Sequence, residues 1–469
     1  MKPTGSNRLF PILSALIIFI SSALLAIWSL RNTIALRNAL LAVGAVLALF
    51  LFWHYARKSN FKNASDRSTS SWASYIPLIL CFVMLIWVVI HYLLFSSEPG
   101  QQFQELTSTW VRVLESLLVG AATGLLLKDH PQRAQFLWLG IFGSFVYLLI
   151  HYLGMYFQTG LAFMPNYYFS SPFGNKINTV LMGGIFISAI GGSAAAALIH
   201  NHPSYSWPVY CYWLLGVFTM LFAFTTIIDT RNGVGVGIIL ITSWLLFVGI
   251  SKLIQQIRLK KLDWKLGLAI LIPTVFIIIF IQQHLSINRG WNHFVDDLAV
   301  AVKIDEVPNW QDVKKYGYPN TASGEQVYPN NYERAAWATA GIHSMIQNPL
   351  GYGMLEHSLG KVIRKSYPEA MIRSSHSAWI DLGLAFGIPG LLLTLGALIS
   401  TAILALKSNS PNRLVVIWIV ADLLLTFTIA EVSSKHTIEI LFFCIALLNT
   451  MLLGQNNTEN QSSRNSISR

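Results

Sequence analysis

Two residues of this sequence, His376 and Arg334, have the side chains that a proton transfer and the binding of an anion would need. His376 lies where a long polar interval, residues 286–376, meets apolar sequence. An imidazole has an unperturbed pKa of about 6.5, so it can act as a general base on a hydroxyl group at neutral pH. Arg334 has Trp337 beside it at helical spacing. An arginine on such a partly apolar helix face favours contact with a fixed anion.

A third candidate, Arg231, belongs to the short stretch Asp229-Thr230-Arg231-Asn232-Gly233 between two apolar runs. A charge so close to two helix ends is costly unless it is paired or used. Structural explanations stand beside the functional ones. Asp229 can pair with Arg231, Arg334 can be a snorkelling or salt-bridged surface residue, and His376 can be an interfacial histidine without a role. From the residues alone, both explanations stay open.

The composition indicates the kind of scaffold that holds these residues. Of the 469 residues, 54% are hydrophobic and only 11% are charged, whereas a soluble domain carries about 25% charged residues. This composition is typical of an all-α polytopic membrane protein. The three cysteines, Cys81, Cys211 and Cys444, lie far apart in apolar runs. They form no metal-binding spacing, and we expect them to be small buried hydrophobic residues.

The apolar runs predict about twelve transmembrane helices, because about twenty apolar residues cross the hydrocarbon core as a helix. Nine precede the polar interval, in residues 1–285, and three follow it, in residues 377–454. The tail, 455–469, is rich in Asn and Ser and is expected to be disordered. The predicted spans are 9–30, 34–56, 75–95, 111–127, 134–153, 177–199, 208–228, 235–254, 266–285, 380–406, 413–431 and 438–453.

The distribution of Lys and Arg predicts the orientation of these spans. The net charge is +11, and most Lys and Arg of the connecting segments fall on one side if the N-terminus is cytoplasmic. By the positive-inside rule, both termini are then cytoplasmic and residues 286–376 form an outer loop. The positive charge is therefore a signal of topology, and it predicts no nucleic-acid partner.

This polar loop, residues 286–376, is expected to be partly helical. Residues 331–347 have a helical pattern that Asn330 or Asn331 can cap, and residues 355–365 form a second short candidate helix, whereas residues 296–320 read as irregular. The loop has equal numbers of acidic and basic residues. Any anion site in it must therefore be local. The second helix would place these apolar side chains on one side: Leu355, Leu359, Val362 and Ile363.

The order of several short motifs resembles the O-antigen ligase and O-antigen polymerase superfamily. Each motif alone is weak, but their order, spacing and predicted topology are together fairly specific. The resemblance covers about residues 170 to 395 and rests on Ser170-Ser-Pro-Phe-Gly-Asn175, Thr230-Arg-Asn-Gly233, Arg334-Ala-Ala-Trp337, Asn348-Pro-Leu-Gly-Tyr-Gly353, His376-Ser-Ala-Trp-Ile380 and Gly387-Ile-Pro-Gly390. One departure is Asp381, where the family more commonly has a neutral polar residue.

The resemblance implies a metal-independent glycosyl transfer, without a cofactor, at the periplasmic face of a Gram-negative inner membrane. The donor would be a saccharide on undecaprenyl diphosphate, the acceptor would be lipid A–core, and membrane lipids would surround the protein. Residues at the positions of His376, Arg231 and Arg334 are the functional set of that family. We further expect contacts to the diphosphate or glycan from Lys176, Trp337 and Asp381.

Within this superfamily the ligase is favoured, because the chain ends soon after the last span without the additional outer domain of many protein O-oligosaccharyltransferases. An O-antigen polymerase and a protein O-oligosaccharyltransferase are the alternatives. A different class is a flippase or other transporter of polyprenyl-linked saccharides. Such a protein should carry its polar site near the middle of the membrane. Asp422 is the residue that falls in the middle of a predicted span.

Overall fold

A computed structural model describes most of the chain, namely residues 6–60, 72–164, 166–200, 205–260, 264–287, 293–433 and 435–453. Within these residues the secondary structure is helical, with one isolated bridge between Asn320 and Gln326 and no strand. The predicted all-α fold class is confirmed for this part of the chain. The prediction of a disordered tail, residues 455–469, lies outside the described residues.

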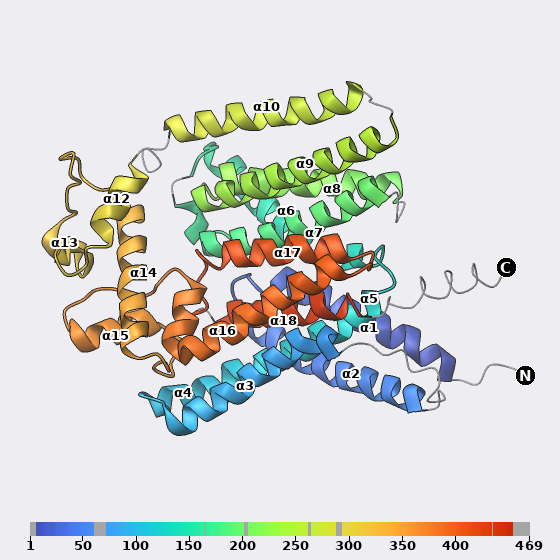
Figure 1. Cartoon of the computed structure of the whole chain (residues 1–469), viewed down its shortest axis with the longest axis horizontal. Helices are drawn as coiled ribbons and strands as arrows, with labels where there is room; N and C mark the ends of the chain where they lie inside the picture. The colour runs from blue at the N-terminus through green and yellow to red at the C-terminus, as the bar shows by residue number, and fades with distance from the viewer. Residues whose placement is uncertain are drawn as a thin grey trace, which may run out of the picture.

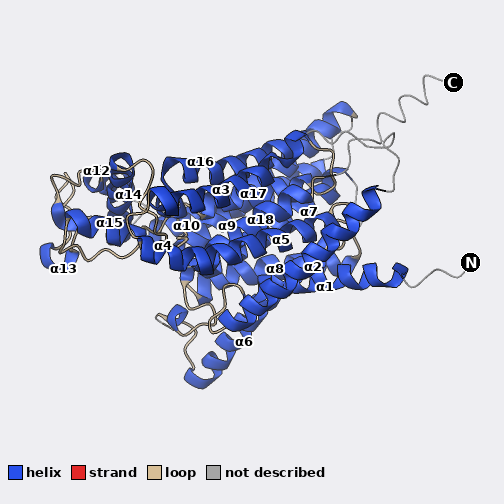
Figure 2. Cartoon of the chain, turned by 90° about the horizontal axis from the view of Figure 1, so that it is seen from below, coloured by secondary structure: helices blue, strands red, loops and turns tan. Residues whose placement is uncertain are grey.

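Long helices run side by side and form a bundle, and shorter helices of the polar loop lie at one end of it (Figures 1 and 2). The bundle helices are α1 (Ser6–Ile27), α2 (Ile34–Asn60), α3 (Ile76–Leu94), α4 (Pro99–Glu105), α5 (Val111–Leu127), α6 (Ala134–Thr159), α7 (Lys176–His200), α8 (Trp207–Phe222), α9 (Arg231–Arg258), α10 (Trp264–Ile287), α16 (Ala378–Lys407), α17 (Arg413–Thr426) and α18 (Lys435–Thr450). The loop helices are α12 (Phe294–Ala301), α13 (Val313–Tyr316), α14 (Pro329–Gln347) and α15 (Ser358–Ser366).

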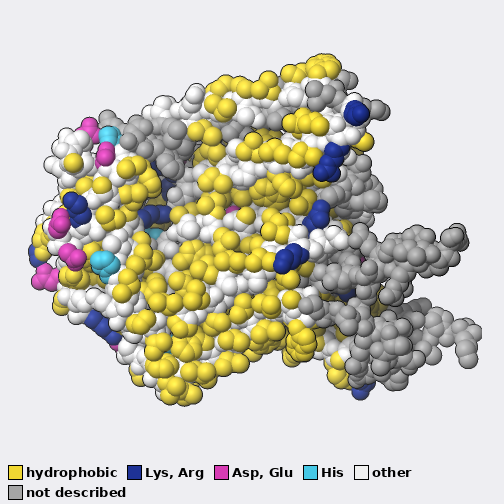
Figure 3. Space-filling model, in the orientation of Figure 1, with side chains coloured by type: hydrophobic (Ala, Val, Ile, Leu, Met, Phe, Trp, Pro, Cys, Tyr) yellow, Lys and Arg dark blue, Asp and Glu magenta, His cyan; other side chains and the backbone are white. Residues whose placement is uncertain are grey.

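Nine helical segments in the described residues are long and apolar enough to cross a membrane, which is typical of a multi-pass membrane protein. Hydrophobic side chains cover the visible side of the bundle, while charged side chains gather toward its two ends (Figure 3). The predicted number of twelve spans is not established. Near the C-terminus, α17 has only 14 residues and the apolar segment His436–Thr450 is also short. The predicted span 266–285 corresponds to α10, which is not among the nine segments.

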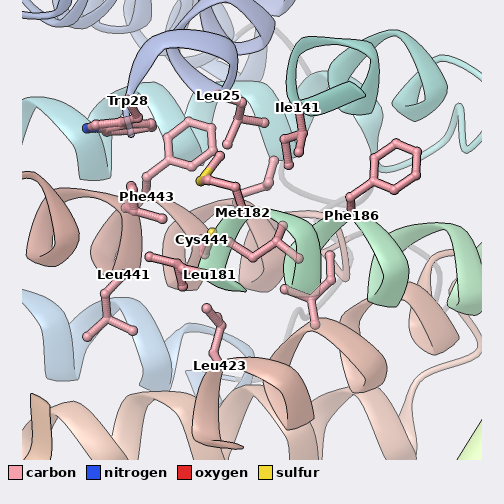
Figure 4. Close-up of a cluster of buried hydrophobic side chains, with 14 of the residues drawn as sticks. Leu25, Trp28, Ile141, Leu181, Met182, Phe186, Leu423, Leu441, Phe443 and Cys444 are labelled. Carbon is pink, nitrogen blue, oxygen red and sulfur yellow. The ribbon is translucent and has the colours of Figure 1, made fainter. Parts of the chain in front are cut away.

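The bundle interior is built from α1, α6, α7, α17 and α18, whose large apolar side chains interdigitate (Figure 4). Trp28 of α1 packs edge-on against Phe443 of α18, with ring centroids 5.1 Å apart. Small residues bring α5 against α18, because a Cβ on Gly124 would lie 2.3 Å from the carbonyl oxygen of Leu447. Close packing at small residues is the usual way in which helices associate in a membrane.

The cysteines follow their prediction only in part. Cys81 and Cys444 are buried, as expected, but Cys211 is exposed on the surface of α8. The prediction was wrong for Cys211 because an apolar run does not reveal which side of a helix faces the other helices.

The polar loop is more ordered than its sequence indicates. It forms its own hydrophobic cluster, including Trp310 and Tyr332, and this cluster packs on Ile380 and Leu384 of α16. Residues 296–320 were expected to be irregular, but they contain the end of α12, a short 3-10 turn and α13. The four apolar residues predicted to share one side of the second helix are all buried, but that helix, α15, begins at Ser358, so Leu355 lies before it. The loop is therefore a compact layer attached to the bundle end.

The start of α14 also differs from its prediction. The helix begins at Pro329, and its N-cap Tyr328 makes no side-chain capping bond. Asn331 instead donates to Asp297 at 2.8 Å, and the backbone N–H of Tyr328 donates to the same carboxylate at 3.0 Å. The predicted cap was wrong because a buried carboxylate from α12 fixes this end of the helix.

A break in α16 joins the polar loop to the bundle. Gly387 interrupts the helix with a φ of 68°, so nearby backbone groups lose their helical partners. The segment 349–353 pairs with them: Tyr352 N–H donates to the Leu384 carbonyl at 2.8 Å, and Gly353 N–H donates to the Ala385 carbonyl at 2.7 Å. The motifs Asn348–Gly353 and Gly387–Gly390, separate in the sequence, thus form one structural unit.

The end of α17 also differs from the predicted span 413–431. The helix ends at Thr426, and residues 427–433 form an irregular connection to α18. Backbone N–H groups of Val432 and Ser433 donate to the Asp381 carboxylate at 3.1 and 3.2 Å. The shorter helix therefore places Glu431 in a loop at the bundle end.

Candidate functional site

His376 occupies a tight turn immediately before α16. Its φ of 53° lies in the left-handed region, which is uncommon for a residue with a side chain and is found at functional sites held by their surroundings. The turn is fixed on both sides, because Ser375 Oγ lies 3.0 Å from the N–H of Ser377 and 2.6 Å from Asp381 Oδ1. Ser377 is the N-cap residue of α16, without a side-chain capping bond.

Asp381 holds this turn in place from within the bundle. Its side chain is 1% exposed, and its carboxylate accepts from the hydroxyls of Ser375 and Ser358 and from the backbone of Val432 and Ser433. A buried carboxylate needs such donors. We predicted contact between Asp381 and a substrate. That contact stays a prediction. In the structure the carboxylate is surrounded by protein donors, which join the segments around His376 and Glu431.

Arg334 and Arg231 reach the same region from different parts of the chain. Arg334 lies in the second turn of α14, and Arg231 is the first residue of α9. The guanidinium of Arg231 lies over the ring of Tyr328, 4.5 Å from its centroid, directly before α14 begins. The two guanidinium groups are close enough to repel each other, and this repulsion contributes to lowering the pKa of Arg334, after the larger effect of burial.

Lys176 adds a third cation to this group. Its ammonium donates to the backbone carbonyl of Asp229 at 2.6 Å and lies 4.8 Å from the ring centroid of Tyr168. Within the described residues, none of Lys176, Arg231 and Arg334 forms a salt bridge with a carboxylate. Asp229 therefore attracts Arg231 electrostatically without neutralising it in a direct pair. Three half-buried cations in one place suit the binding of an anion.

Glu431 is a further residue of the candidate site, and no sequence pattern singled it out. It lies in the connection after α17, and its Oε2 atom is buried without a hydrogen-bond partner. Burial lowers the pKa of His376, while the negative charge of Glu431 raises it and the positive charge of Arg334 lowers it. The signal in the sequence was an acidic residue at the outer end of an apolar span. Only its neighbours in the structure distinguish it from other such residues.

Trp337 forms one wall of the site. Its ring lies beside the His376 imidazole, with centroids 5.6 Å apart and an interplanar angle of 30°. Its indole N–H donates to the Trp310 carbonyl at 3.4 Å, which ties it to the polar loop. The ring therefore presents an apolar face beside the imidazole.

The structure therefore brings together five of the six predicted site residues and places Asp381 beneath them. The arrangement can bind an anionic group next to a general base, at the end of an apolar bundle. This chain matches no protein-family model, and it has no significant match among curated proteins.

Proposed function

We propose that this protein is a glycosyltransferase that moves O-antigen polysaccharide from undecaprenyl diphosphate onto lipid A–core. One observation supports the proposal most. Arg334, whose charge acts on His376, belongs to one group of half-buried cations with Arg231 and Lys176, where the polar loop meets the apolar bundle. In the described residues none of the three forms a salt bridge, although Glu431 and Glu333 attract Arg334. A diphosphate on a lipid would meet the cations while its tail stays among the apolar helices. The order of the motifs, which resembles that of O-antigen ligases, gives the substrate class.

In the proposed reaction, a hydroxyl oxygen of the acceptor forms a bond to the anomeric carbon of the donor. The bond from that carbon to the diphosphate oxygen breaks, and undecaprenyl diphosphate leaves with the electron pair. Arg231, Arg334 and Lys176 stabilise the charge that develops on the leaving oxygen. His376 takes the hydroxyl proton, and Glu431 stabilises the resulting imidazolium. Trp337 supports the imidazole ring, and Asp381 holds the turn.

The proposed location is the inner membrane of a Gram-negative bacterium, with about twelve spans, both termini in the cytoplasm and the site in the periplasm. Two features support this orientation. Lys and Arg gather in the segments at the end of the bundle opposite the polar loop, as the positive-inside rule requires. The candidate site lies at the polar-loop end, where a finished polysaccharide can reach it.

Reconstitution with purified undecaprenyl-diphosphate glycan tests the proposal and separates the alternatives. We expect product on lipid A–core, and we expect equal turnover in excess chelator, because the three cations supply the positive charge that a metal ion would supply in other enzymes. A lengthened lipid-linked glycan would instead identify an O-antigen polymerase, and a glycoprotein would identify a protein O-oligosaccharyltransferase. Loss of turnover in chelator would contradict the metal-independent chemistry.

The reaction should depend on pH through His376. Burial lowers the pKa of its imidazole from the ordinary value of 6.5. The neutral base is therefore present at pH 7, and kcat/KM should fall only as the pH drops through a value below 6.5. Glu431→Gln removes the charge that raises this pKa, so the acid limb should move to still lower pH. A profile of kcat/KM against pH measures the position of the acid limb in the wild type and its shift in Glu431→Gln. An acid limb above pH 6.5, or one unmoved by Glu431→Gln, would contradict this assignment.

A transporter of polyprenyl-linked saccharides is the second candidate, and Asp422 is the observation that favours it. This carboxylate is fully buried between α17 and α7, where a Cβ on Gly184 would lie 2.4 Å from its Oδ1 atom. Thr426 donates to Oδ1 at 3.0 Å, and Oδ2 has no hydrogen-bond partner. Asp422→Asn decides between the classes: loss of function there, with function kept in His376→Ala, would favour the transporter.

A further inference from the structure

An open groove of about 480 Å³ lies on the polar loop, outside the group of cations described above. It runs between α15 and the segment 368–373, which returns toward His376. Its titratable side chains are His357, Lys361, Arg364, Glu369 and Arg373. The loop as a whole has balanced charge, so this gathering of basic groups is local.

The groove carries a net positive charge. The acidic member, Glu369, is offset by Lys315, whose ammonium lies 2.6 Å from its carboxylate. Burial and the charge of Arg373 lower the pKa of His357, so this ring is neutral at pH 7. Lys361, Arg364 and Arg373 remain. In the described part of the chain none of the three forms a salt bridge. The charge of the neighbouring Glu356 also acts on His357, but three cations against this one carboxylate leave the groove with an excess of positive charge.

Neutral acceptors hold these side chains in place. The guanidinium of Arg364 donates to the Ile372 carbonyl at 2.9 Å, and Lys361 donates to the side chain of Gln101. Arg373 lies with its Nη2 atom 3.3 Å from Nε2 of His357. Each cation is thus oriented by a neutral partner. It keeps its full charge, and it has further N–H groups that can donate to a ligand. Oriented cations with free donors suit phosphate oxygens, which accept several charge-assisted hydrogen bonds.

The inner end of the groove connects to the candidate site. His357 precedes Ser358 and Arg373 lies three residues before His376, and Asp381 Oδ1 accepts from both Ser358 and Ser375. The same buried carboxylate thus fixes the groove and the turn of His376. The charge of Glu431 acts on His357 as well as on His376. The groove and the proposed base are therefore held by one carboxylate and lie within reach of the charge of another.

We propose that this groove binds the phosphate groups of a phosphorylated saccharide acceptor and directs an acceptor hydroxyl toward His376. The inference rests on the proposed function and adds to it a second anion site. Arg231, Arg334 and Lys176 hold the diphosphate of the donor at the bundle, whereas Arg373, Arg364 and Lys361 hold the acceptor from the side of the polar loop. Two separate sites let the enzyme distinguish two anionic substrates.

Binding without turnover tests the groove directly. The probe is a phosphorylated oligosaccharide, compared with its phosphatase-treated form, and affinity for the purified full chain is measured by calorimetry. Removing one charge-assisted contact in Arg373→Gln should weaken binding of the phosphorylated probe by about tenfold or more, and high salt should weaken binding to the wild type. Arg373→Lys keeps the charge and should retain part of the affinity. Lys303→Gln, an exposed charge elsewhere on the loop, should bind as the wild type does.

The transfer assay adds a second readout. Arg373→Gln should raise the KM for a phosphorylated acceptor by about the same factor, while the KM for the donor and kcat stay unchanged. Equal binding of both probe forms, or an unchanged affinity in Arg373→Gln, would overturn the groove proposal. If the wild type binds the phosphorylated probe selectively but transfers no glycan, the proposed function fails and the phosphate site stands.

Discussion

Replacing His376 with alanine is expected to lower the rate of glycan transfer by about 10²- to 10⁴-fold, the usual contribution of a general base. The charges of Arg334 and Glu431 both act on this imidazole, and burial lowers its pKa, so it is neutral at pH 7 and can accept a proton. Binding of the lipid-linked donor should change little, because the cations are unaffected. Single-turnover transfer, measured with donor affinity in the same preparation, separates the two effects.

His343→Ala is the matched control. It removes an exposed histidine from α14, in the same loop, and should transfer at the wild-type rate. Arg231→Ala and Arg334→Ala should abolish transfer. Unlike His376→Ala, they should also weaken binding of the donor diphosphate. All these variants should insert into the membrane normally. Transfer at the wild-type rate by His376→Ala would remove this residue from the mechanism.

Replacing Gly351 with alanine is expected to detach the polar loop from the bundle. Gly351 has a φ of 91°, and an added Cβ would lie 2.4 Å from the backbone nitrogen of Gly387. The left-handed strain costs about 1–3 kcal/mol. The clash adds to this by separating the hydrogen bonds that join segment 349–353 to the break in α16. We expect a clearly lowered unfolding temperature in detergent, faster proteolysis within the loop and loss of transfer.

Gly324→Ala separates strain from clash. Gly324 also has a positive φ, 86°, but nothing lies within 4 Å of an added Cβ. This control should therefore lose only the stability that the left-handed backbone strain costs, and it should keep its transfer activity. If Gly351→Ala and Gly324→Ala lowered the unfolding temperature equally, the junction at Gly387 would not be what holds the loop.

Local sequence patterns predicted much of this fold. Apolar run length predicted the bundle, and helical spacing predicted α14 and the buried side of α15. Residue chemistry made His376 and the two arginines candidates, and the resemblance of the motifs to a known family selected them. The predictions failed at element ends, as at Thr426 and Tyr328, because a partner elsewhere in the chain fixes those ends.

Only the tertiary structure decided which polar residues meet. The ring of Tyr328 lies under Arg231, nearly a hundred residues earlier in the chain, and no local period describes that contact. Glu431 became part of the site because α17 ends early and Asp381 accepts the freed backbone groups. The sequence indicated the apolar helices and the candidate side chains, since the length of an apolar run, helix periodicity and residue type are local properties. The packing of the polar loop on the bundle end decided their arrangement, because it depends on contacts between distant segments.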